Sequence, residues 1–191
     1  MVTWLPFYLV RERQFSMAGM AKTGGAVFLL SALSASLCGW LSDRWIAAGC
    51  SHSRVLKNFM AVSLAGVGVF LLAAVLSPGN AGIAFLMLAG IAFGLGSSNI
   101  WAITQRLAGR EAVGRWCGIQ LFVGNSAGVV APAVTGFLLD RTGHFYWPFL
   151  IVSMFLWAGA LCWLFVVGPV EPVEWEPSTA AIAAEAVGSP A

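Results

Sequence analysis

Long stretches without a charged side chain set the strongest limit on how this chain can fold. They cover 23–42, 58–105, 116–139 and 145–167, and the second is interrupted midway by Ser77-Pro78-Gly79-Asn80. A helix of roughly 20 residues crosses the ~30 Å hydrocarbon core of a bilayer. Because backbone groups in lipid must be satisfied within the segment, these stretches favour helices over strands. The sequence therefore predicts an all-α, polytopic transmembrane bundle with five full spans.

The composition excludes several classes of function. Hydrophobic residues make up 59% of the chain and charged residues only 9%, against roughly 25% charged in soluble domains. The net charge of +2 is small and scattered, so we expect no nucleic-acid partner. His52 and His144 lie outside the spans and no two cysteines form a C-x-x-C pair. We accordingly expect the lipid bilayer as the surroundings, and no enzyme activity, metal or cofactor.

Both ends of the chain differ from the spans. The apolar stretch 2–10 stops at Arg11-Glu12-Arg13, too early to span, and suggests the end of a sixth helix; an interfacial anchor is the alternative. We assign 1–22 to this truncated helix and an external loop, and 23–168 to the five-span bundle. Residues 169–191 are acidic, contain several prolines and lack an apolar period, so a disordered tail is expected.

The basic residues predict the orientation. The loops after the first and third spans hold six of the ten cations: Arg44, Arg54, Lys57, Arg106, Arg110 and Arg115. Short loops rich in Lys and Arg stay in the cytoplasm. On the opposite side lie Arg11, Arg13, Lys22 and Arg141. We therefore expect a multi-pass protein of the cell (inner) membrane with a cytoplasmic C-terminus.

Polar groups inside the spans are candidates for function. Asn125 lies mid-span, where an unpaired amide costs several kcal/mol. It must bond a neighbouring helix or line a cavity for water or solute, and both interpretations stay open. Ser98 and Trp101 share a helix face with Gly90 and Gly94, and packing is favoured there over solute contact, because small-xxx-small spacing permits close helix approach.

Two further stretches carry a family resemblance. The first is Gly39-Trp40-Leu41-Ser42-Asp43-Arg44, followed by Gly49, Arg54 and Lys57. The second is the fourth span with its following loop, G-I-Q-L-F-V-G-N-S-A-G-V-V-A-P-A-V-T-G-F-L-L-D-R-T-G. These resemble the loop between helices eight and nine, and helix eleven, of the anion:cation symporter branch of the major facilitator superfamily. The opening T-W-L-P-F-Y-L-V-R-E-R is similar to the end of helix seven.

The resemblance implies half of a twelve-helix transporter whose partner is the missing N-terminal six-helix half. It implies secondary transport of a small organic anion or sugar acid, with proton symport by alternating access. Its substrate positions would be Ser98, Trp101 and Asn125, and we include Asn99 beside them. Asp43 and Arg44, with Gly39, would form a gating contact in the cytoplasmic loop, and Arg44 also suits a membrane anchor with Asp43 as its partner.

No span contains a charged residue, so groups that bind a solute's charge or carry a coupled proton would lie on chain outside this sequence. The alternative to a working transporter half is a non-transporting membrane remnant, or a scaffold half that needs a partner half.

Overall fold

The computed structural model describes residues 5–173, and every regular element in that range is helical. The elements are α1 (Leu5–Arg11), α2 (Met17–Ala47), α3 (His52–Leu76), α4 (Gly79–Thr142), α5 (Tyr146–Leu161) and a π-helical turn at Cys162–Val166. Four of them, with the π-turn counted as part of α5, are long and apolar enough to cross a membrane. The predictions of an all-α fold and of membrane helices are confirmed.

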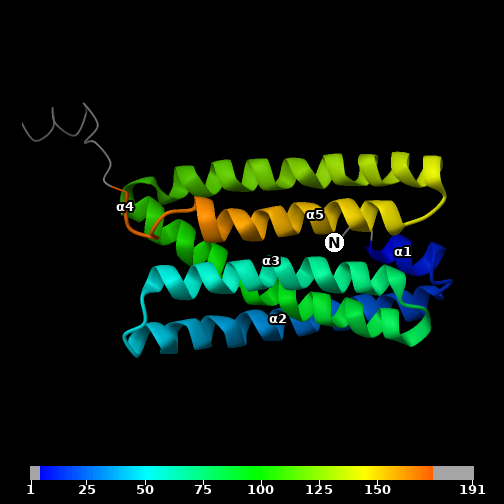
Figure 1. The fold of residues 1–191 in the computed structure, drawn as a ribbon, viewed down its shortest axis with the longest axis horizontal. Helices are drawn as coiled ribbons and strands as arrows, with labels where there is room; N and C mark the ends of the chain where they lie inside the picture. The colour runs from blue at the N-terminus through cyan, green and yellow to red at the C-terminus, as the bar shows by residue number, and fades with distance from the viewer. Residues whose placement is uncertain (1–4, 174–191) are drawn as a thin grey trace, which may run out of the picture.

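The longest element, α4, is two helices joined at Gly109. Its 64 residues would extend about 96 Å, roughly three times the hydrocarbon core. The backbone leaves helical geometry at Gly109, with φ 62° and ψ −172°, a conformation that glycine adopts without steric cost. Figure 1 shows the chain turning back at this point. We call 79–108 the first arm of α4 and 110–142 its second arm.

The helix termini gather at two ends of the bundle (Figure 1). At one, which we call the Gly109 end, Val173 donates its N–H to the Leu107 carbonyl at 3.0 Å. At the other, the Arg13 end, the Arg13 guanidinium donates to the Ser77 carbonyl at 2.6 Å. The six cations assigned above to the basic loops all belong to the Gly109 end.

The first arm of α4 packs closely against α2 through Gly90 and Gly94. A Cβ on Gly90 would lie 2.8 Å from the Val27 carbonyl oxygen, and one on Gly94 would overlap the Ser31 carbonyl. The packing interpretation of these two glycines is therefore correct. In the second arm a Cβ on Gly114, Gly118, Gly124 or Gly128 would meet nothing within 4 Å.

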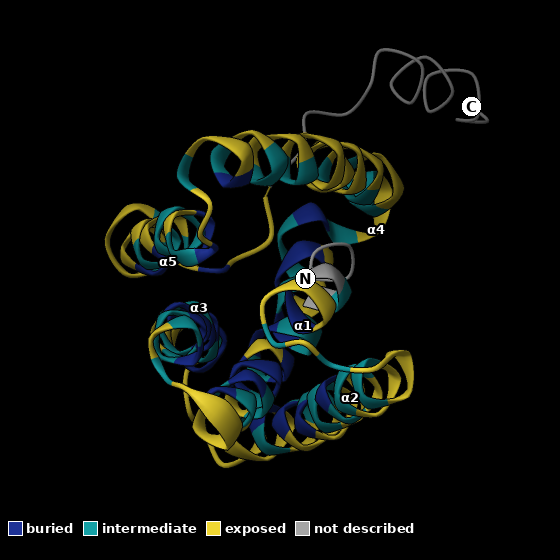
Figure 2. Ribbon diagram, turned by 90° about the vertical axis from the view of Figure 1, so that its right-hand side faces the viewer, coloured by how far each residue is buried: buried dark blue, intermediate teal, exposed yellow. Residues whose placement is uncertain are grey.

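The two arms of α4 also differ in how far their residues are buried (Figure 2). The inward faces of α3 and of the first arm are buried, whereas every residue of 121–130 in the second arm is exposed. The arms are joined near Gly109 by the Thr104 hydroxyl, which donates to the Gln120 side-chain oxygen at 2.7 Å. The chain therefore has one well-packed part and one arm with a largely uncovered surface.

The helices end where the charge-free stretches predict at one turn, but α2 begins earlier than predicted. α3 ends at Leu76 and α4 begins at Gly79, as the Ser77–Asn80 break predicts. α2, however, begins at Met17, inside the segment assigned to a loop, because the Ser16 side chain caps it by accepting the Gly19 N–H at 3.1 Å. Lys22 is exposed on this first part of the helix.

Of the expected disordered tail, 169–173 are placed against α3 and α4, and 174–191 lie outside the described residues.

Candidate functional site

An open pocket at the Gly109 end brings together most of the site residues proposed from the sequence. Its volume is about 680 Å³, within the ~300–1,000 Å³ typical of small-molecule sites. It lies between α2 and the first arm of α4, with two residues of α3 at its edge. Four of the proposed residues line it: Gly39, Asp43, Ser98 and Asn99. We call it the α2–α4 pocket.

Ser98 lies at the narrow contact between the two helices. A Cβ on Gly39 would be 3.8 Å from the Ser98 Oγ, so the small residue of α2 leaves room for this hydroxyl. The Ser98 Oγ is buried and has no hydrogen-bond partner among the described residues. A buried hydroxyl without a hydrogen-bond partner destabilises the fold unless water, another part of the chain or a solute bonds to it.

Asn99, in contrast, is fully engaged within the fold. Only 2% of the residue is exposed. Its Oδ1 accepts from the Ser42 hydroxyl at 3.1 Å, and its Nδ2 donates to the Leu95 carbonyl at 3.0 Å and to the Cys38 sulfur at 3.3 Å. Asn99 therefore joins α4 to α2, and we expect it to hold the pocket wall in place.

We predict that Asn99→Ala destabilises the folded chain by about 1–2 kcal/mol, because it removes the hydrogen bonds of the buried Asn99 amide with the Ser42 hydroxyl and the Leu95 carbonyl. The measurement is thermal unfolding of the purified chain in detergent. Ser36→Ala is the matched control, since the exposed Ser36 hydroxyl bonds only the Ala32 carbonyl of its own helix. Equal stabilities for both variants and the original chain would contradict this role.

Asp43 and Arg44 lie side by side in the last turns of α2 without an ion pair between them. Adjacent helical residues point in different directions, and among the described residues no ion pair joins these two. Asp43 lines the α2–α4 pocket, whereas the Arg44 guanidinium lies 5.5 Å from the centre of the Trp40 ring. This placement in the last turn of α2 suits a cation at a helix C-terminus. Gating by these residues stays a prediction.

The other two proposed residues lie away from the pocket. Trp101 is 38% exposed. Asn125, in the second arm, is exposed, and its Nδ2 donates to the Leu121 carbonyl of its own helix at 2.8 Å. No bond from Asn125 to another helix exists within 5–173, so the hydrogen bond of its Nδ2 is local and its surface is uncovered.

Four polar residues of the pocket were not among the site residues proposed from the sequence: Ser42, His52, Gln105 and Arg106. Gln105 and Arg106 follow Ser98 by seven and eight residues, the spacing that returns to one helix face, and this signal could have found them. His52 could not be found in this way, because it reaches the pocket from the start of α3. Arg106 brings a cation to a pocket that Asp43 also lines.

The comparison with known families decides what kind of protein this fold belongs to. The sequence profile described as Major Facilitator Superfamily matches residues 4–187. The chain belongs to that superfamily. The resemblance seen in the 39–57 region and in the second arm is thereby confirmed, and the chain is a multi-pass membrane protein of this transporter superfamily.

Three of its relatives are named as transporters, or probable transporters, of organic acids. The chain is 31% identical to the hexuronate transporter of Bacillus subtilis over 80% of its own length and 37% of that protein. It is 32% identical to the probable sulfoacetate transporter SauU of Cupriavidus necator, over 86% of this chain and 38% of the relative. The probable galactarate/D-glucarate transporter GarP of Escherichia coli is 26% identical over 91% and 39%. The chain therefore spans about two-fifths of these major facilitator proteins.

Proposed function

We propose that this chain forms five membrane spans, and the end of a sixth, in the C-terminal half of a twelve-helix secondary transporter for a small organic anion such as a sugar acid. The observation that carries the proposal is the superfamily match across 4–187, together with relatives named for hexuronate, sulfoacetate and galactarate or D-glucarate. Division of α4 at Gly109 supports five spans, because each arm is long enough for one crossing and too short for two.

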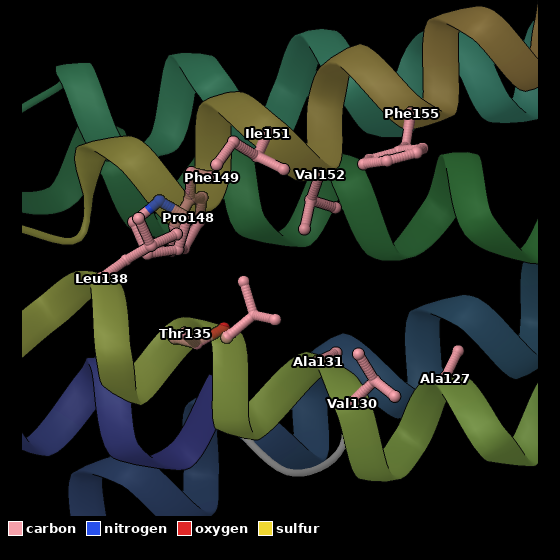
Figure 3. A pocket seen from close by; sticks show the side chains of 11 residues that line it. Ala127, Val130, Ala131, Thr135, Leu138, Pro148, Phe149, Ile151, Val152 and Phe155 are labelled. Atoms are coloured by element: carbon pink, nitrogen blue, oxygen red, sulfur yellow. The ribbon is translucent and has the colours of Figure 1, made fainter.

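The surroundings of α1 support its assignment to the end of a longer helix. Tyr8 is fully buried, with its ring 5.3 Å from the Phe145 ring and 5.0 Å from the Phe149 ring. Phe149 also lines an apolar groove of about 320 Å³ between the second arm and α5. Figure 3 shows side chains of the two helices facing each other across this groove. The walls of this groove are uncovered within 5–173, with Val130, Val134 and Phe155 exposed, which suits a further helix of the complete transporter.

The uncovered second arm supports the need for a partner half. Residues 121–130 are all exposed, and the glycines of this arm have open space around them. Glycines at such spacing suit close contact with another helix or with a solute cavity. In a two-half transporter a site near the midplane forms where the halves meet. Asn125 would face that site, with Ser98 at the pocket that leads to the Gly109 end.

Proton symport and alternating access belong to the same proposal. The groups that bind the solute's charge and carry the proton would lie in the partner half, because no span here contains a charged residue. The Gly109 end would be cytoplasmic, since it carries the larger share of the cations. An in-frame continuation of roughly another 200 residues with helical spans upstream of Met1 would support this arrangement.

We predict that Asn125→Ala in the complete transporter raises the KM for galactarate or glucuronate by about tenfold to a hundredfold, the effect of losing a hydrogen bond to a charged group. The measurement is uptake of labelled sugar acid by vesicles. Ser126→Ala is the matched control, because this exposed hydroxyl bonds only its own helix, at the Phe122 carbonyl. Unchanged affinity and uptake in Asn125→Ala would remove Asn125 from the site.

Vesicles that contain only this chain give a second test. We expect no uptake, because one half alone does not enclose a central site. Uptake of hexuronate or galactarate above empty vesicles would overturn the assignment to half of a transporter. Absence of uptake by the complete protein for every organic acid tested would instead favour the non-transporting alternative.

A further inference from the structure

The segment after α5 is fastened to the Gly109 end by hydrogen bonds. We call residues 167–173 the C-terminal strap. Lys57 donates to the Val167 carbonyl at 2.5 Å, and Val170 donates its N–H to the Ser53 hydroxyl at 3.1 Å. On the other side, Arg106 Nε donates to the Val170 carbonyl at 3.1 Å and Val173 donates to the Leu107 carbonyl at 3.0 Å. The strap therefore ties α3 to the first arm of α4.

One side chain of the strap is part of the core. Val170 is 1% exposed and packs with Leu56, Met60 and Ile103. The partly buried Trp163, in the π-turn, closes the same cluster. Val173, three residues further on, is 41% exposed. A simple linker needs no buried side chain, so Val170 acts as the anchor of the strap.

The local backbone directs the strap to this place. The π-turn ends with the Val167 N–H bonded to the Cys162 carbonyl at 3.0 Å, five residues back, and such turns are frequent at functional positions. At the receiving end, the break at Gly109 interrupts the helical bonding of the preceding turn. The Leu107 carbonyl therefore accepts a hydrogen bond from the Val173 N–H.

The strap and the α2–α4 pocket share two wall residues. Leu56 contacts the cluster around Val170 and also lines the pocket. Arg106 bonds the strap through Nε and lines the pocket from the first arm. Asp43 and His52 are the other titratable groups at the pocket. The strap is therefore in contact with the pocket's one guanidinium and with the cluster that contains one of its apolar wall residues.

We propose that the C-terminal strap is a latch that sets the shape of the α2–α4 pocket. With Val170 seated, Arg106 and Leu56 are fixed at the pocket wall. Release of Val170 frees Arg106 from the Val170 carbonyl and opens the cluster beneath the strap. The device is limited to one buried side chain and four hydrogen bonds, a unit small enough for local opening without global unfolding. It is independent of which solute the protein carries.

The test measures the strap and the pocket separately in the full 191-residue chain, purified in detergent. Cys50, Cys117 and Cys162 are replaced by serine, and the buried Cys38 is retained. In one version Met60→Cys, under the strap, reports opening through its rate of maleimide labelling. In the other, Ala102→Cys carries a bimane whose emission reports the pocket. Val170→Gly is compared with Val173→Gly, which makes the same change at the exposed strap residue.

We expect Val170→Gly to raise labelling at Met60→Cys by about tenfold, the factor expected when the burial of one valine side chain is lost. It should also shift the bimane emission, and Val173→Gly should do neither. Ser53→Ala with Lys57→Met, which removes the two hydrogen bonds from α3 without changing the strap, should act in the same direction. Unchanged labelling in Val170→Gly overturns the latch, and increased labelling with an unmoved bimane overturns its coupling to the pocket.

Discussion

Gly94→Ala will destabilise the folded chain by about 3 kcal/mol, whereas Gly118→Ala will leave its stability unchanged or slightly raised. Each variant adds one methyl group to one arm of α4. A Cβ at Gly94 would overlap the Ser31 carbonyl, and would lie 2.7 Å from the Ser34 Cβ and 3.0 Å from the Ala35 backbone nitrogen. These atoms belong to the α2 backbone or are bonded directly to it, so no side-chain rotation can move them away from the added methyl group. α2 must move as a whole.

Gly118 lies in the other arm, where a Cβ meets nothing within 4 Å. The methyl group there costs no packing and lowers the flexibility of the unfolded chain. The comparison is made by thermal unfolding of the purified 191-residue chain in detergent, with the gel-filtration profile as a check of folding. Equal effects of the two substitutions would contradict the packing of α2 against the first arm.

The membrane helices and the turn between α3 and α4 could be predicted from the sequence because both depend on local composition. Lipid excludes charge, so charge-free stretches mark the spans, and Pro78 with Gly79 marks the turn between α3 and α4. The turn between the two arms of α4 was predicted less accurately. Residues 106–115 were expected as a loop on account of their charges, yet helix continues up to Gly109 and directly after it. A charged helical turn at a membrane surface has the same composition as a loop.

The candidate site was predicted only where its residues lie near each other in sequence or on one helix face. Ser98 was placed on one helix face with Gly94, and Asn99 was included beside it. The Ser42 partner of Asn99 is 57 residues away, and no local pattern indicates such a contact. Val170 was assigned to a tail because the segment around it lacks an apolar period. Its burial comes from side chains of α3 and α4, which meet only after the chain has folded.

Arg13 is another residue whose role arises only from long-range contact. The sequence suggested no more than a cation on the side opposite the basic loops. In the structure its guanidinium donates to the Tyr8 hydroxyl at 2.8 Å, the Ala74 carbonyl at 2.5 Å and the Ser77 carbonyl at 2.6 Å. Ala74 and Ser77 belong to the C-terminal end of α3, where carbonyls lack helical partners and a cation is favoured. Arg13 therefore fastens α1 to the end of α3.

We predict that Arg13→Met destabilises the chain by about 3 kcal/mol, because three hydrogen bonds from a charged donor are lost and water at this end replaces them only in part. Arg13→Lys should recover less than half of the loss, since an ammonium does not reproduce the directions of the guanidinium donors. The measurement is again thermal unfolding in detergent. Lys22→Met is the control, because this side chain is exposed on α2.

The same substitution has a second expected effect on Tyr8. With the guanidinium gone, the Tyr8 hydroxyl loses its partner, so its ring should leave its place beside Phe145 and Phe149 part of the time. Proteolysis between α1 and α2 should then become faster in Arg13→Met than in Lys22→Met, because a loosened α1 exposes the connection to cleavage. Equal cleavage rates would mean that the aromatic contacts of Tyr8 hold α1 in place without Arg13.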